Sequence, residues 1–124
     1  MTKPIKMIEH FSNIEACPIR NVLDRLGDKW TILVVLILHE MGKVRFNKLQ
    51  NVIGDISQKM LTVTLRKLEA DGLVSREIFT EIPPRVEYQL TKRGESLVPH
   101  ITNLAQWALK NMPSIVISRT EYSD

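Results

Sequence analysis

The side chains with the most specific chemistry lie close together after Ser57. If residues 58–71 form a helix, three leucines share one of its faces, whereas amide, hydroxyl and basic side chains share the other. The leucines are Leu61, Leu65 and Leu68, and the polar set is Gln58, Lys59, Thr62, Arg66 and Lys67. The major groove of DNA admits one α-helix, whose outer side chains can reach the base edges. The spacing therefore predicts a DNA-reading helix, with a merely solvated polar face as the alternative.

The predicted roles follow from the hydrogen-bonding capacity of each side chain. Gln58 can pair with adenine through two hydrogen bonds, and Arg66 or Lys59 can read guanine or hold a phosphate. Thr62 and Thr64 can contact a thymine methyl group or a phosphate. We therefore expect base reading on the outer face of this helix.

The remaining predicted DNA contacts support or flank this helix. Ser57 is placed to cap it, because a serine hydroxyl can accept an N–H of the first turn. Arg45, Lys48 and Lys67 are expected to hold phosphates, which position a protein on DNA without reading its sequence. Arg85 follows two prolines at an expected hairpin tip, where an arginine can enter the minor groove or clamp the backbone.

The elements around the reading helix predict a winged helix-turn-helix. A shorter helix is expected over residues 46–52, and the short link 54–56 suits two helices packed at a steep angle. Two strands of a hairpin, residues 73–80 and 85–90, are expected to follow. The fold class is therefore mainly α with a small β-hairpin wing.

Two further helices are expected before this motif. Cys17-Pro18 opens the first, because proline suits the first helical position, and Gly27 can close it. Asp28 is a plausible N-cap for the second, which runs from Lys29 to residue 39 or 40. The second is apolar almost all round from residue 30 to 38, so it must lie in the domain core or in an oligomer interface. We favour the core.

A long helix is expected at the C-terminal end. Thr91 caps it, Pro99 should kink it, and it should run to about Asn111, where Pro113 terminates it. Its apolar stripe is Leu97, Ile101, Leu104, Ala105 and Ala108. We favour a dimer interface for this stripe over the core of the monomer.

The domain organisation follows from these elements. Residues 1–16 are expected to form a flexible arm, with a short helix around residues 5–11. Residues 17–111 form one domain that includes the dimerisation helix 91–111, and residues 112–124 form a tail. A chain of 124 residues has the size of a single compact domain.

The positive charge is concentrated in the middle of the chain. The net charge is +3, and residues 43–93 hold ten Lys and Arg against six Asp and Glu. Such a cluster is what a phosphate-binding surface requires, although a solvated surface with a mild basic bias would also account for it. No secretory signal or bilayer-spanning run is evident, and a single cysteine does not indicate export, so we expect a cytoplasmic protein that does not bind membranes.

Catalytic and metal-binding patterns are not evident. His10, His39 and His100 lack metal-ligand spacing, and there is no glycine-rich phosphate loop. Cys17 could pair with a histidine as a nucleophile only if the fold brought them together. We expect neither enzymatic activity nor a cofactor.

Taken together, the motifs resemble the HxlR-type bacterial transcriptional regulators, which are relatives of the MarR-type winged-helix repressors. The resemblance covers roughly residues 17–108. Its blocks are Cys17-Pro18, Leu23-Asp24, Gly27-Asp28-Lys29-Trp30, Arg45-Phe46-Asn47-Lys48-Leu49, Ile56-Ser57-Gln58-Lys59-Met60-Leu61-Thr62, Leu65-Arg66-Lys67-Leu68-Glu69-Ala70-Asp71-Gly72-Leu73-Val74, Pro83-Pro84-Arg85-Val86-Glu87-Tyr88, Leu90-Thr91 and Gly94. The resemblance implies a homodimer, held by its N- and C-terminal helices, that binds an inverted-repeat operator. Its two reading helices would enter successive major grooves about 10 bp apart.

Cys17 is a candidate redox sensor. Free N–H groups at a helix start and the nearby Arg20 favour a reactive thiolate. The resemblance implies sensing of oxidants or electrophiles, since many HxlR-type members use a cysteine at this Cys-Pro position. With one cysteine per chain, sensing would need a bond between subunits, a small-thiol adduct or alkylation. The alternative is a small residue that only packs.

Two other functions remain compatible with this sequence. One is a regulator gated by a small ligand at the dimer interface, and the other is a protein-interaction module on the same fold. A steep salt dependence would separate DNA binding from a largely apolar protein contact. A Cys17→Ser variant would separate thiol sensing from ligand gating.

Overall fold

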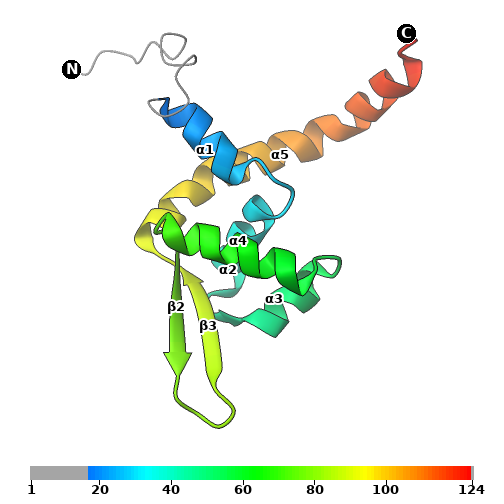
Figure 1. The fold of residues 1–124 in the computed structure, drawn as a ribbon. Coiled ribbons are helices and arrows are strands. Elements are labelled where there is room, and N and C mark those ends of the chain that lie inside the picture. Colours follow the sequence, from blue (N-terminus) through cyan, green and yellow to red (C-terminus); the bar gives the residue numbers. More distant parts are fainter. Residues whose placement is uncertain (1–16, 124) are drawn as a thin grey trace, which may run out of the picture.

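The computed structural model describes residues 17–123, which form five helices and three strands (Figure 1). In chain order the elements are α1 (Pro18–Leu26), α2 (Thr31–Met41), β1 (Val44–Arg45), α3 (Phe46–Ile53), α4 (Gln58–Ala70), β2 (Val74–Phe79), β3 (Arg85–Leu90) and α5 (Lys92–Glu121). The predicted winged helix-turn-helix is confirmed, with α3 and α4 as its helix pair. The predicted N-terminal arm, with its helix around residues 5–11, lies outside the described residues.

The wing is a hairpin that projects away from the helices (Figure 1). Its strands pair antiparallel, from Val74 opposite Leu90 to Phe79 opposite Arg85. Strand β1 completes the sheet by pairing with β3, where Val44 lies opposite Tyr88. Strand β1 was not predicted from the sequence, because two residues are too few to show an alternating pattern.

Helix α2 lies at the centre of the hydrophobic core. Its residues Val34, Val35 and Leu38 are buried, and they join leucines from α3 and α4 in one cluster. The prediction that the apolar helix belongs to the core is thereby confirmed. Because α4 packs its leucines against this buried helix, α2 helps to determine the position of α4.

The start of α2 shows how Asp28 caps it. Its Oδ1 accepts N–H bonds from Trp30 and Thr31, each at 2.8 Å, and the Thr31 hydroxyl donates to its Oδ2 at 2.6 Å. This is the bonding expected of an N-cap. The regular helix is assigned from Thr31, two residues later than predicted, which is within the usual spread for helix ends.

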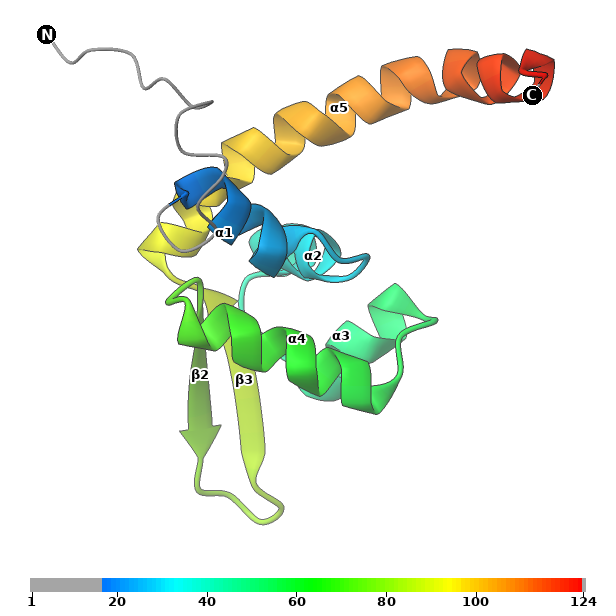
Figure 2. The same cartoon turned by 45° about the horizontal axis from the view of Figure 1, so that its top comes forward.

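Helix α5 is longer than predicted. Thr91 caps it by accepting the N–H of Gly94 at 3.1 Å, and the helix continues through Pro99 and Pro113 to Glu121. The prediction that Pro113 ends the helix and that a tail follows is therefore wrong. A proline removes one backbone hydrogen bond and bends the axis, but helical geometry can resume beyond it. Figure 2 shows that α5 curves and that its C-terminal part extends beyond the other elements.

Candidate DNA-binding surface

Helix α4 is fixed at both ends. The Ser57 hydroxyl accepts the N–H of Met60 at 3.0 Å, so the predicted cap is present. At the other end Gly72 has a φ of +72°, and Leu73 donates its N–H to the Leu68 carbonyl at 2.9 Å. Glycine is favoured there because a left-handed conformation strains a residue that carries a Cβ. These caps set where the helix begins and ends.

The two faces of α4 match the predicted pattern. Leu61, Leu65 and Leu68 are buried in the core, whereas Gln58, Lys59 and Arg66 are exposed. Thr62 is half-buried, and its hydroxyl donates to the Gln58 carbonyl at 2.8 Å. The outer face is thus free to meet another surface.

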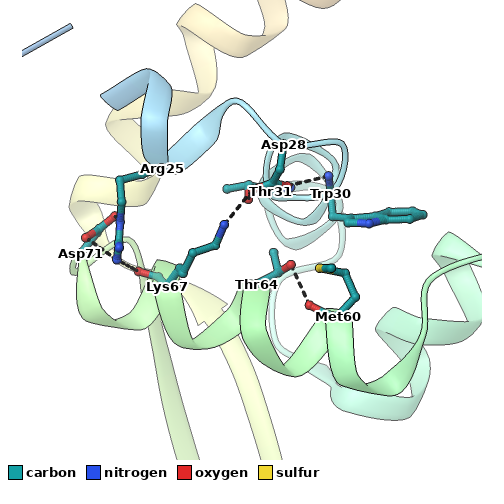
Figure 3. Close-up of polar contacts among 8 residues, drawn as sticks. All are labelled: Arg25, Asp28, Trp30, Thr31, Met60, Thr64, Lys67 and Asp71. Carbon is teal, nitrogen blue, oxygen red and sulfur yellow. Dashed lines mark hydrogen bonds and ion pairs between the residues drawn. The ribbon is translucent and has the colours of Figure 1, made fainter. Parts of the chain in front are cut away.

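Thr64 does not belong to that outer face. It is fully buried, and its hydroxyl donates to the Met60 carbonyl at 2.8 Å (Figure 3). The suggestion that Thr64 contacts DNA is therefore wrong. The helical period places residue 64 beside Leu61 and Leu68, on the side that packs into the core.

Four basic side chains near α4 are not neutralised by acidic neighbours. Arg45 and Lys48 flank or lie on α3, while Lys59 and Arg66 lie on α4, and all four are exposed. Within residues 17–123 none of these four forms an ion pair. Their positive charge is available to an anionic partner such as the phosphate backbone.

Lys67 lies on a different side of α4. Its ammonium is 2.8 Å from Asp28 Oδ2, and Figure 3 shows it extending from α4 toward the start of α2. Burial alone would raise the pKa of Asp28, but hydrogen bonds from Lys67, Thr31 and Trp30 outweigh it and hold that pKa well below its usual range. Lys67 is engaged within the protein, and its predicted phosphate contact stays a prediction.

A second ion pair ties the end of α4 to α1. The guanidinium of Arg25 binds both carboxylate oxygens of Asp71, at 3.0 and 3.1 Å, and a third contact of 3.4 Å reaches the Lys67 carbonyl. The hydrogen bond and the charge of Asp71 raise the pKa of Arg25. This pair was not predicted from the sequence, because residues 46 positions apart carry no local signal of contact.

Arg85 of the wing is engaged by neighbouring side chains of the same hairpin. The Arg85 guanidinium lies 4.0 Å from the centre of the Phe79 ring, and its Nη1 is 3.4 Å from Glu81 Oε1. Its Nε is 3.9 Å from Glu87 Oε1. Beside it, a cavity of about 440 Å³ is lined by Arg45, by the start of α3 and by the hairpin tip. At that tip Ile82 is fully exposed.

Cys17 occupies the predicted N-cap of α1. Its Sγ accepts the N–H of Arg20 at 3.4 Å, and the residue is only 1% exposed. A reagent would reach the sulfur only after a local movement of the surrounding chain. The burial is compatible both with packing and with a gated sensor.

Apolar surface is exposed on α1 and α5. Helix α1 buries none of its residues, and Ile19, Val22 and Leu23 are exposed. The predicted α5 stripe divides: Ile101 is buried in the chain's own core and Leu97 packs against it, whereas Leu104 is 55% exposed. Ala105 and Ala108, also predicted for the interface, are half-buried. Further exposed apolar residues on α5 are Trp107, Leu109, Met112, Val116 and Ile117.

Within residues 17–123, a membrane-spanning helix and a metal-binding cluster are both absent. No helix there combines the length and apolar character needed to cross a lipid bilayer. In the same residues no three His, Cys, Asp or Glu side chains are grouped so that they could bind a metal ion.

Comparisons with known proteins place this geometry in a family. The family model described as HxlR-like helix-turn-helix matches residues 25–116. The chain is similar to the HTH-type transcriptional regulator YybR of Bacillus subtilis, with 42% identity over 102 residues, covering 82% of this chain and 80% of that protein. It is similar to YtfH of Escherichia coli as well, with 39% identity over 107 residues, covering 86% and 84%.

Solved structures show the same likeness. The redox regulator HypR in its reduced form matches with a TM-score of 0.74 and 39% identity, covering 79% of this chain and 96% of that chain. HypR in its oxidized form matches with a TM-score of 0.71 and 41% identity, covering 77% and 97%. At 39% and 41% identity, the similarity to HypR is one of sequence as well as of fold.

Proposed function

Because the chain belongs to the HxlR-like helix-turn-helix family of transcriptional regulators, we propose that it acts as a homodimer that binds an inverted-repeat DNA operator. The observation that carries this proposal is the outer face of α4, where exposed polar side chains stand beside four cations without ion-pair partners in residues 17–123. The residues proposed to contact DNA are Arg45, Lys48, Ser57, Gln58, Lys59, Thr62, Arg66, Lys67 and Arg85. Lys67 and Arg85 are the weakest members, since acidic neighbours already engage them.

The exposed apolar surfaces of α1 and α5 support the homodimer. Leu104 and Trp107 are each more than half exposed, and an apolar helix face of this kind is stabilised by a second copy of itself. A homodimer held through α5 would carry two copies of α4, related by its two-fold axis. Such a dimer would match a two-fold symmetric operator.

The test is selection of DNA by the purified protein, followed by a salt titration. The wild-type protein should enrich an inverted repeat from a pool of random duplexes, and sedimentation should show a dimer. The affinity for that duplex, measured by fluorescence anisotropy, should fall steeply with salt, with a log–log slope of about −0.9 for each phosphate contact. If the protein enriches no duplex from the pool, a protein-interaction module on the same fold is supported instead.

We further propose that modification of Cys17 alters DNA binding. The similarity to HypR, a redox regulator, supports this, as does the position of the thiol at the start of α1. Treatment with diamide or a quinone should change the affinity of the wild-type protein for its selected duplex and leave Cys17→Ser unchanged. A response that persists in Cys17→Ser would favour gating by a small ligand.

A further inference from the structure

Two ion pairs connect the C-terminal end of α4 to α1 and to the link between α1 and α2. Lys67 reaches Asp28 at the start of α2, and Asp71, at the end of α4, reaches Arg25 near the end of α1 (Figure 3). Lys67 and Asp71 are four positions apart, so their side chains lie on the same side of the helix end. In both views α1, α2 and the C-terminal half of α4 are neighbours (Figures 1 and 2).

In the Asp28–Lys67 pair, the carboxylate also accepts backbone hydrogen bonds. Asp28 caps α2 through two N–H bonds while it binds Lys67, and both side chains are about 30% exposed, at 32% and 30%. Each of the two charges has lost part of its hydration through partial burial, so each depends on the other for stabilisation. For Lys67 to reach a phosphate, its ammonium would have to leave the Asp28 carboxylate, which lies at 2.8 Å.

The Arg25–Asp71 pair lies one helical turn further along, at the C-cap of α4. It is bidentate, a geometry that fixes both the distance and the relative angle of the two side chains. The same guanidinium also approaches the Lys67 carbonyl at 3.4 Å. One residue of α1 thus contacts α4 at both Asp71 and Lys67.

We propose that Asp28, Lys67, Arg25 and Asp71 are positioning residues for the DNA-reading helix, which they hold at a fixed angle to α1 and α2. This rests on the proposed function and revises it at one residue, since Lys67 would position α4 instead of contacting DNA. It also connects α4 to α1, the helix that Cys17 caps, so a displacement of α1 would be transmitted to α4.

A double-mutant cycle on Asp28 and Lys67 tests this proposal. The variants are Asp28→Asn, Lys67→Met and the double variant, which keeps the wild-type net charge because one charge of each sign is lost. Affinity for the duplex selected by the wild-type protein is measured across a salt series. The slope reports phosphate contacts, and the value extrapolated to 1 M salt reports the contacts that do not depend on released counterions.

We expect both single variants and the double variant to lose about tenfold in the 1 M value, equivalent to ~1.4 kcal/mol. The double variant should lose no more than either single variant, because each removes the same pair. Its slope should equal that of the wild type. Lys67→Arg, which keeps the ion pair, should restore binding, and Arg25→Met with Asp71→Asn should behave like the first cycle.

Lys59→Met is the matched control, since it removes an exposed lysine of the same helix that forms no ion pair in the described part of the chain. It should make the salt slope less steep by about 0.9 and leave the affinity extrapolated to 1 M salt nearly unchanged. Circular dichroism and thermal unfolding of each variant show whether the fold is kept. If Asp28→Asn does not fold, the comparison of Lys67→Met with Lys67→Arg carries the test.

Three results separate the possibilities. If Lys67→Met lowers the slope like Lys59→Met while Asp28→Asn binds as well as the wild type or better, Lys67 is a phosphate ligand and the proposal is overturned. Unchanged binding in every variant overturns it too. If the wild-type protein selects no duplex, it is the proposed function that fails.

Discussion

The reading helix and the wing lie in the same basic stretch of sequence, yet their charges are arranged differently. On α4, Lys59 and Arg66 are exposed and, within residues 17–123, take part in no ion pair. From residue 74 to 90 the wing holds two arginines and three glutamates, and both arginines form ion pairs. The net positive charge of the middle segment therefore comes from α3, α4 and their flanks rather than from the wing.

This difference shows that basic residues must be assessed in space and not counted along the chain. Glu87 lies close to Arg85 because the two residues are two positions apart on β3 and so share one face of the strand. Glu81 approaches Arg85 across the turn at the hairpin tip. On α4 the only acidic residue is Glu69, near its C-terminal end, where it pairs with Arg76 of the wing. We therefore expect α4 to supply most of the attraction for DNA and the wing to act mainly as a stiff arm.

The largest contrast should appear in stability. Leu65→Ala on α4 should lower the free energy of unfolding by about 2–5 kcal/mol, because it leaves a cavity in the core. Ile78→Ala on the wing should cost less than ~1 kcal/mol, since this side chain is more than half exposed. Urea unfolding followed by circular dichroism measures both. Equal losses would mean that the wing is packed as firmly as α4.

The next contrast is in DNA affinity. Arg66→Ala should weaken binding to the selected duplex by ~1–3 kcal/mol if Arg66 reads a base. Arg85→Ala should have a smaller effect, because Glu81 and Phe79 already engage this guanidinium. Anisotropy titrations of the two variants at one salt concentration give the ranking. A greater loss for Arg85→Ala would assign the main DNA contact to the wing.

Sequence alone predicted most of this architecture because its signals are local. Caps at Cys17, Ser57 and Thr91, with the helical spacing of the leucines on α4, depend on neighbours within a few residues, and each appears as expected. Pro113 misled the prediction, because the cost of one lost hydrogen bond does not determine whether a helix resumes. Capping residues and helical spacing therefore predict well where an element begins, but they predict less well where a long helix ends.

The candidate site was predicted less completely, for a related reason. A helical pattern shows that Lys59, Arg66 and Lys67 are polar positions, but it does not show what each faces across the fold. Lys67 faces Asp28, which lies 39 positions earlier in the chain. The same holds for the contact between Arg85 and the Phe79 ring, which depends on the register that places these two residues opposite each other.

The ion pair that holds α4 should also give the protein a specific response to acid. The pKa of Asp28 is lower in the folded protein than in the unfolded chain, where it is near ~3.9, so its contribution is present above that pH and is lost as the pH falls below it. We expect Asp28→Asn to lose about 1 kcal/mol of stability at pH 6, the lower end for hydrogen bonds to a charged group that remains partly solvated. Urea unfolding at pH 6, 4 and 3 should show this difference shrinking toward acid pH. A constant difference would mean that lost capping, rather than the charge, accounts for the effect.

The smallest expected effect is a gain on the wing, and it tests the comparison most directly. Glu81→Gln removes the carboxylate that lies 3.4 Å from Arg85 Nη1, so the guanidinium becomes available to a phosphate or to the minor groove. The affinity for the selected duplex should rise a few-fold, less than ~1 kcal/mol because both groups are partly exposed. Glu121→Gln is the control, since it removes an equal charge at the far end of α5. If both variants gain equally, the effect is one of net charge alone. If Glu81→Gln gains nothing, Glu81 does not restrain Arg85, and the contrast between wing and helix must have another origin.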